Sequence, residues 1–138
     1  MMQARIGDDM VVRLADGEDF AAALAAVPID SGVIVGGIGM LKNVRLGYWN
    51  GHSYEEHCIN EPGELLSAQG TLAAGPEGRA VHCHVSIARR DGTVCGGHLI
   101  AAEASTTTEI VLRVFRGIRL VRRPDPNGLL GLYPELSD

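Results

Sequence analysis

Residues 80–88 alternate between two kinds of side chain, and this alternation restricts the fold more than any other feature of the chain. The apolar positions are Val81, Cys83, Val85 and Ile87. The intervening polar or small positions are Ala80, His82, His84, Ser86 and Ala88. Because successive side chains of a β-strand point to opposite faces, this period of two predicts a strand with one face against a core. His82 and His84 then share the face that points away from that core.

Most of the remaining chain is typical of short strands joined by turns. We expect further strands at residues 10–14, 31–38, 44–49, 53–59, 64–72, 94–102 and 107–115, and a loop over residues 124–138. Asn50-Gly51 predicts a two-residue hairpin turn between two of these strands. Asp91-Gly92 predicts a second hairpin, which folds residues 94–102 back against residues 80–88.

Residues 20–27 give the only pattern typical of a helix. Phe20, Leu24 and Val27 fall on one helical face, Asp16 is the expected cap and Pro28 ends the segment. One helix among many turn-linked strands indicates an α+β fold, in which a mostly antiparallel β-sheet carries one main α-helix packed on it. We expect residues 1–138 to form a single domain, with its core at about residues 10–120 and a C-terminal tail at 121–138.

Composition places the chain among globular proteins and excludes several function classes. It has 138 residues, of which 46% are hydrophobic and 21% are charged, with a formal net charge of −5. A negative domain is repelled by phosphate backbones, so we expect no autonomous DNA binding. No stretch approaches the roughly 20 apolar residues of a membrane span, and no secretory signal opens the sequence. Three cysteines without such a signal favour reduced thiols and a cytoplasmic location.

A third histidine makes the His82/His84 pair a candidate metal site. The turn at Asp91-Gly92 returns the chain so that His98 comes opposite the pair, and Gly96-Gly97 would let the backbone bend to aim its ring. Neutral imidazole is a common zinc ligand, and three protein ligands with one open position are typical of catalytic zinc. Two histidines on an exposed strand face are also compatible with solvated surface, and both interpretations stay open.

Other residues give weaker indications. Glu64 opens a strand and is a candidate general base or hydrogen-bond partner of the site, or else a solvated strand start or a partner for Arg13. Cys95 is a less favoured ligand than the histidines, and His52 and His57 are expected at the surface.

Five arginines are concentrated near the C-terminus. They are Arg113, Arg116, Arg119, Arg122 and Arg123. On a helix this spacing would give a basic stripe suited to phosphate. The apolar residues between them favour a strand instead, so we expect the charges to be spread over strand ends and loop.

Several motifs in order resemble the plant and prokaryote conserved domain, the PPC domain of AT-hook nuclear proteins. They are Arg13-Leu14, Gly17-Glu18-Asp19, Gly37-Ile38-Gly39-Met40-Leu41, Val44-Arg45-Leu46-Gly47-Tyr48, Glu64-Leu65-Leu66-Ser67-Ala68-Gln69-Gly70, His82-Cys83-His84-Val85, Gly96-Gly97-His98-Leu99 and Thr108-Glu109-Ile110. They run from about residue 10 to residue 115. A cupin would continue the His-X-His pattern with a glutamate, but residues 87–90 contain none.

The resemblance implies a fold, an assembly and a ligand set, but no established reaction. It implies an antiparallel sheet with a packed helix, a homotrimer, and binding of zinc or another divalent transition metal by His82, His84 and His98. It leaves the substrate, and whether the protein is an enzyme, undetermined. The favoured hypothesis is a zinc-binding domain with a small-molecule ligand near the metal. The alternative is a non-catalytic oligomerisation or partner-binding module with a regulatory or DNA-associated role, although the sequence has no AT-hook.

Overall fold

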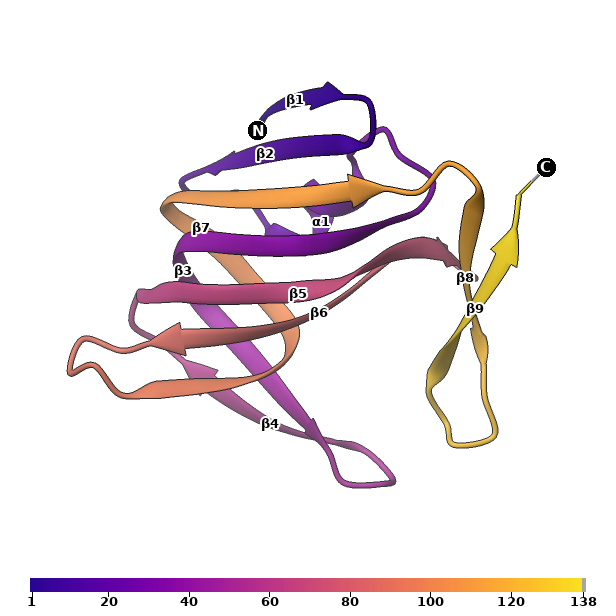
Figure 1. The fold of residues 1–138 in the computed structure, drawn as a ribbon. Coiled ribbons are helices and arrows are strands. Elements are labelled where there is room, and N and C mark those ends of the chain that lie inside the picture. The colour runs from indigo at the N-terminus through magenta and orange to yellow at the C-terminus, as the bar shows by residue number, and fades with distance from the viewer. Residues whose placement is uncertain (138) are drawn as a thin grey trace.

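The computed structural model of this chain describes residues 1–137 as one nine-stranded sheet with one short helix (Figure 1). The elements are β1 (Met2–Ile6), β2 (Asp9–Ala15), α1 (Phe20–Ala25), β3 (Gly32–Trp49), β4 (Tyr54–Ile59), β5 (Gly63–Gly75), β6 (Gly78–Ala88), β7 (Val94–Val114), β8 (Ile118–Pro124) and β9 (Leu130–Leu136). The expected antiparallel sheet is therefore present, but the described chain is almost entirely β-structure.

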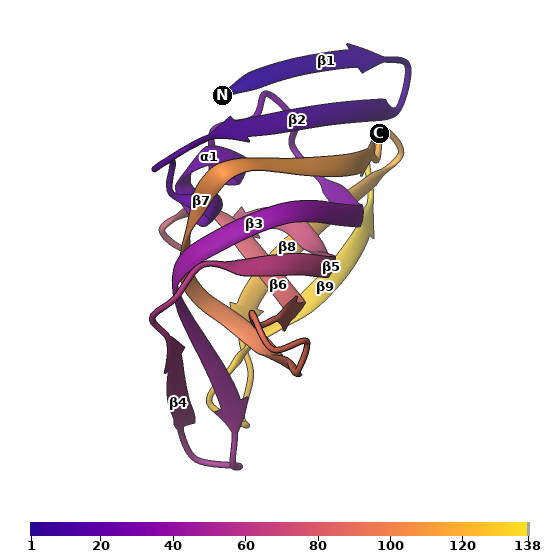
Figure 2. The same ribbon diagram turned by 90° about the vertical axis from the view of Figure 1, so that its left-hand side faces the viewer.

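Strands from distant parts of the sequence lie side by side in this sheet. Its order is β1-β2-β7-β3-β5-β8-β9, with β4 added beside β3 and with β6 between β5 and β7. Figure 2 shows a strongly curved sheet with β1 and β2 at one end and β4 at the other. Every pairing is antiparallel except the single bridge between β5 and β8.

Two long bent strands replace four predicted short ones. The segments expected at 31–38 and 44–49 are both parts of β3, and those expected at 94–102 and 107–115 are both parts of β7. The β3–β7 register shifts at four places, so each strand bends without ending. In Figure 1 the first half of β3 and the second half of β7 lie side by side, with β7 next to β2, and the other halves of the two strands turn towards β4 and β6. This bend brings one half of β7 to the core near the helix and the other half to the histidines.

The C-terminal segment is ordered, in contrast to the loop predicted for it. Strands β8 and β9 form an antiparallel hairpin, and Val121 bridges Ala74 of β5. Leu120 anchors the hairpin because its side chain is buried and its backbone N–H donates to Ser31 Oγ at 2.9 Å. Strand β1 was also not predicted, and the four-residue segment 50–53 replaces the two-residue turn expected at Asn50-Gly51. Residue 138 of the predicted tail lies outside the described residues.

Helix α1 is shorter than predicted and begins at a different cap. Asp19 is the N-cap, and its Oδ1 accepts a hydrogen bond from Ala22 N at 2.7 Å. Phe20 and Leu24 are fully buried in the core cluster. Within residues 1–137 no helix has the length and apolar content needed to cross a bilayer.

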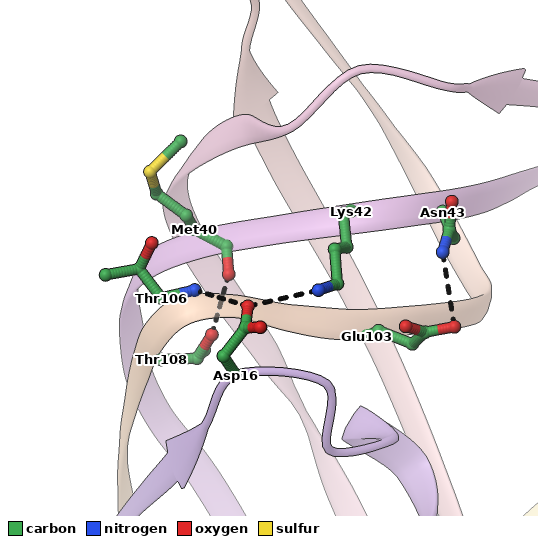
Figure 3. A network of polar contacts seen from close by, with 7 residues as sticks. All are labelled: Asp16, Met40, Lys42, Asn43, Glu103, Thr106 and Thr108. Atoms are coloured by element: carbon green, nitrogen blue, oxygen red, sulfur yellow. Dashed lines mark hydrogen bonds and ion pairs between the residues drawn. The ribbon is translucent and has the colours of Figure 1, made fainter.

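Asp16, predicted as the helix cap, instead joins a polar corner at the bend of β7 (Figure 3). Its Oδ1 accepts hydrogen bonds from Thr106 N at 2.9 Å and from Lys42 Nζ at 3.0 Å. Thr106 has a positive φ of 64°, so this bond holds a backbone conformation that few side chains favour. The hydrogen bond from Thr106 N, followed by the contact with Lys42, holds the pKa of the Asp16 carboxyl below its usual value.

Neighbouring side chains complete this corner. The buried Thr108 Oγ1 donates to the Met40 carbonyl at 2.8 Å, and Asn43 Nδ2 donates to Glu103 at 3.2 Å. Each of these polar side chains therefore has a partner. We refer to Asp16, Met40, Lys42, Asn43, Glu103, Thr106 and Thr108 as the Asp16 corner.

Candidate metal centre

Strands β6 and β7 bring the three predicted histidines together. His84 on β6 pairs directly with His98 on β7, and His82 lies two residues before His84 on the same face. The opposite face of β6 lies against the core, as the alternation predicts: Cys83, Val85 and Ile87 are buried and Val81 packs against the core cluster. Burial raises the pKa of the Cys83 thiol to about 11, which keeps it protonated and makes it a poor ligand.

The ring nitrogens are close enough to share one ion. His82 Nε2 and His84 Nε2 are 3.1 Å apart, and one nitrogen from each of the three rings lies within 4.8 Å of the others. Two nitrogens on a tetrahedral zinc ion, each at about 2.0–2.1 Å from the metal, are separated by about 3.3 Å. The spacing of the first pair is therefore close to that of two ligands on one metal ion. Without an ion, the same contact requires one ring to donate an N–H to the other.

Burial keeps the His82 and His98 rings neutral. The pKa of His82 is lowered to about 4, mainly by burial, and further by the positive charge of Arg122. The pKa of His98 is lowered as well, first by burial, then by His84 and Arg122. A metal ligand must be unprotonated, so at neutral pH both rings offer lone pairs without first losing a proton.

The glycines before His98 act differently from the prediction. The β6–β7 register runs without a shift from Val94 to His98, so Gly96-Gly97 forms no bulge in this pairing. A Cβ at Gly96 would lie 2.6 Å from the Val85 carbonyl oxygen, and one at Gly97 would lie 3.0 Å from the Gly47 oxygen. These glycines therefore allow β6 and β3 to approach β7 closely around His98. The nearest register shift lies farther along β7, in its pairing with β3.

An aromatic side chain that the sequence did not single out supports His98. The Tyr54 ring stacks on the His98 ring with centroids 4.6 Å apart and an interplanar angle of 16°. Trp49 packs edge-on against Tyr54 at 5.2 Å. The Tyr54 ring occupies space that a Cβ at Gly47 would need, because that atom would lie 2.7 Å from Tyr54 Cδ1. Gly47 belongs to a quoted family motif, but the sequence alone does not reveal which ring fills its place.

Arg122 is the second side chain at the site that sequence reasoning missed. Its Nη2 donates to Thr71 Oγ1 at 2.9 Å and its Nη1 donates to the Leu130 carbonyl at 3.1 Å. Its Nε is buried and has no hydrogen-bond partner, and the same is true of His98 Nδ1. The sequence pattern predicts Arg122 to be one of several charges spread over strand ends and loop. Only the pairing of Thr71 on β5 with His82 on β6 shows that it reaches the histidines.

The other arginines of the C-terminal cluster are dispersed, as expected. Arg113 pairs with Asp9 at 2.9 Å and Arg116 pairs with Asp8 at 2.5 Å. Arg123 contacts Glu135, whereas Arg119 is exposed on β8. Because three of the five charges are paired with carboxylates, the cluster does not form a continuous basic stripe.

The structure does not bring the remaining candidates to the histidines. Glu64 is exposed and pairs with Ala88, four residues beyond His84 on β6, which corresponds to roughly 13 Å along the strand. Arg13 donates to Thr107 and not to Glu64. Cys95 packs against the core, and the predicted surface residues His52 and His57 are indeed exposed.

The donor set suits a borderline transition metal. Three imidazole nitrogens match zinc and its neighbours in the transition series, whereas magnesium and calcium prefer oxygen ligands. The buried, unpartnered His98 Nδ1 adds a polar atom that the protein itself does not satisfy. No carboxylate belongs to this group in residues 1–137, so a bound divalent ion would keep its full positive charge.

Comparison with known proteins agrees with this fold. Residues 1–116 match the Plants and Prokaryotes Conserved (PCC) domain family, and the chain belongs to that family. A plant- and prokaryote-conserved (PPC) protein of Pyrococcus horikoshii has 30% sequence identity and a TM-score of 0.85, with 99% of this chain and 96% of that chain covered. A protein of Archaeoglobus fulgidus described as metal-containing has 26% identity and a TM-score of 0.83, with 94% and 95% covered.

A curated relative shows the same kind of sequence within a longer protein. The bifunctional protein GlmU of Synechococcus sp. (strain JA-3-3Ab) is 32% identical over 130 residues, which are 90% of this chain. The chain spans about a fifth of the length of that relative.

Proposed function

We propose that this chain is a metal-binding member of its family in which His82, His84 and His98 hold one zinc ion. The observation that carries the proposal is the 3.1 Å separation of His82 Nε2 and His84 Nε2, with His98 opposite His84 on the next strand. The metal-containing relative from Archaeoglobus fulgidus supports the same interpretation. When bound, such an ion supplies a Lewis acid with an open position for water or a small-molecule ligand.

The protein's own residues would hold the ligand nitrogens in place. The hydrogen-bonded strands β6 and β7 fix the three Cα positions, and the stacked Tyr54 ring restricts rotation of His98. Since the lowered pKa values of His82 and His98 favour the neutral rings, metal binding should meet little competition from protons at pH 7.

Elemental analysis of protein purified without chelator or metal-affinity resin tests the proposal. We expect close to one equivalent of zinc, and His82→Ala, His84→Ala and His98→Ala should each weaken zinc binding by about a hundredfold or more, since even losing an outer-shell partner costs 10–100-fold. His57→Ala is the matched control because His57 is exposed on β4, outside the cluster. The proposal is wrong if all three variants bind as much metal as the parent, or if the parent binds none when zinc is supplied at pH 7.

We further propose that the chain assembles as a homotrimer. Val11, Val111 and Ile38 lie on neighbouring strands and point away from the core, with 51%, 43% and 58% of their surface exposed. Other copies of the chain would cover these apolar side chains. Light scattering should give a trimer at micromolar concentration, and Val111→Lys should dissociate it, whereas Val94→Lys on the β6–β7 hairpin should not. A stable monomer of the parent protein would refute the assembly.

The alternative function is a non-catalytic module that binds protein partners. The exposed apolar side chains of Val35 and Leu66 favour it, with 60% and 49% of their surface accessible. Such a module would need no zinc, so the metal analysis also separates the two functions. With a net charge of −5 and most of the C-terminal arginines paired, we propose no autonomous affinity for duplex DNA in either case.

A further inference from the structure

A cavity opens directly beside the histidines. It has a volume of about 440 Å³ and is lined by His82, His98 and Arg122, by Tyr54, and by the turn of the β8–β9 hairpin. This volume is within the range of small-molecule sites. The hairpin that closes the cavity is the segment expected as loop, so the cavity exists only because β8 and β9 fold back over β5.

Arg122 is held at this cavity in a fixed orientation. Its two hydrogen bonds, to Thr71 on β5 and to Leu130 on β9, occupy one N–H of each terminal nitrogen. The Nε–H remains buried without a partner, and within residues 1–137 no carboxylate forms an ion pair with this guanidinium. A half-buried, immobilised guanidinium without a counter-ion is favourable for binding an oxyanion, because the planar group loses little further freedom on binding.

The charges around the cavity favour an anion. The guanidinium and a divalent ion on three neutral histidines would together place a net charge of +3 at one side of the cavity. Asp125 also lines the cavity and contributes one negative charge there; its carboxylate accepts a hydrogen bond from the Tyr133 hydroxyl and forms no ion pair with Arg122, so the net charge stays positive at +2. A bound anion near Arg122 and the metal would offset part of this remaining positive charge.

The other residues that line the cavity favour an apolar part in the ligand. Ala80, Leu129 and Leu130 contribute apolar side chains, and Gly128 leaves backbone uncovered. A free inorganic anion would fill little of such a space. A short aliphatic chain would bury apolar surface there, which contributes about 0.8 kcal/mol for each methylene fully removed from water.

From these observations we propose that the cavity binds a small organic carboxylate, with its carboxylate group held by Arg122 beside the metal and its apolar body under the β8–β9 turn. This inference rests on the proposed metal function for the second positive charge, while the contacts of Arg122 are independent of the metal.

Titration calorimetry with butyrate as the probe tests the inference. We expect zinc-loaded protein to bind butyrate, to bind acetate and inorganic phosphate more weakly, and not to bind the uncharged butyramide. Arg122→Gln should weaken butyrate binding by about tenfold or more, equivalent to about 1.4 kcal/mol, with zinc content unchanged. Compared with Arg122→Gln, Arg122→Lys should restore only part of the affinity for butyrate, because lysine keeps the positive charge but not the planar guanidinium with its two parallel donors. Arg119→Gln is the matched control, since it removes an exposed charge from the same strand.

The outcomes separate this inference from the metal proposal. The inference is wrong if Arg122→Gln does not change the affinity of zinc-loaded protein for butyrate. It is also wrong if Arg119→Gln weakens butyrate binding as much as Arg122→Gln does. Either result would leave the metal proposal standing. Phosphate that binds more tightly than butyrate would overturn the carboxylate assignment. If the parent binds no zinc, the metal proposal fails, and the same Arg122→Gln comparison on metal-free protein then decides whether Arg122 binds the carboxylate. Circular dichroism of each variant shows whether the fold is kept.

Discussion

Two polar clusters lie along β7, and they differ in whether their groups are satisfied. In the Asp16 corner, at the bend, the Asp16 carboxylate, the Lys42 ammonium and the Thr108 hydroxyl all have hydrogen-bond partners within the chain. In the histidine cluster, on the other half of the strand, His98 Nδ1 and the nearby Arg122 Nε are buried without partners. Native proteins pair nearly all buried polar groups, so the exceptions need an explanation.

The difference separates a structural role from a binding role. The Asp16 corner holds a positive φ at Thr106, and its hydrogen bonds join residues of the chain to one another. The histidine cluster sits beside a cavity with three potential ligand atoms and an unpaired cation. Unpaired buried groups cost stability, and a cluster that keeps them is better explained by a ligand than by folding.

The largest effect should come from filling the space beside His98. Gly47→Ala would place a Cβ 2.7 Å from Tyr54 Cδ1 and 3.0 Å from Ile100 Cδ1, so the Tyr54 ring must shift off His98. Overpacking of this kind destabilises by about 1–3 kcal/mol. Chemical denaturation should show this loss, and zinc binding should weaken as well. Gly117→Ala, where a Cβ meets nothing within 4 Å, is the control and should change neither property. Unchanged zinc affinity in Gly47→Ala would show that Tyr54 does not support His98.

A smaller effect, confined to stability, should follow from a change in the Asp16 corner. Thr108→Val replaces the buried hydroxyl that donates to the Met40 carbonyl with a methyl group of similar size. Loss of one such hydrogen bond should lower the free energy of unfolding by about 1 kcal/mol, with zinc content unchanged. Thr108→Ser keeps the donor and separates the bond from the methyl contact. A loss of zinc in Thr108→Val would contradict the distinction between the two clusters.

The two clusters should also differ in the pH at which each loses stability. His82 has a pKa of about 4 in the folded protein against 6.5 when unperturbed, so between these values the unfolded chain binds more protons. The stability of the metal-free protein should therefore fall as the pH drops from 6.5 to 4. The folded Asp16 carboxyl has a pKa below 3.8, so its stabilising contribution should be lost only at lower pH.

Denaturation curves of metal-free protein at several pH values check this prediction. His82→Ala should reduce the loss between pH 6.5 and 4, whereas Asp16→Asn should leave that window unchanged. An equal slope in the parent and in His82→Ala would show that burial of this ring does not couple to folding.

The histidine strands were predictable because their information is local. The alternation along residues 80–88 is a property of consecutive side chains, and the Asp91-Gly92 turn fixes which strand returns beside it. Together they predict that His98 comes near the pair, and the register shows that its partner is His84. The helix was also predicted, but its cap was not. Asp16 and Asp19 are both good caps by type, and only the contacts of Asp16 with Lys42 and Thr106 remove it from that role.

The sequence by itself determined the strand periodicity, the apolar face of β6 and the set of three histidines, because each depends on neighbours in the chain. The tertiary structure decided what surrounds those histidines. The bends that join four predicted strands into β3 and β7, the pairing of the C-terminal hairpin with β5 and the contact of Arg122 with Thr71 all depend on residues tens of positions apart. Composition and periodicity describe a segment's own preferences, whereas the cavity beside the histidines arises from pairing between segments, which local patterns do not encode.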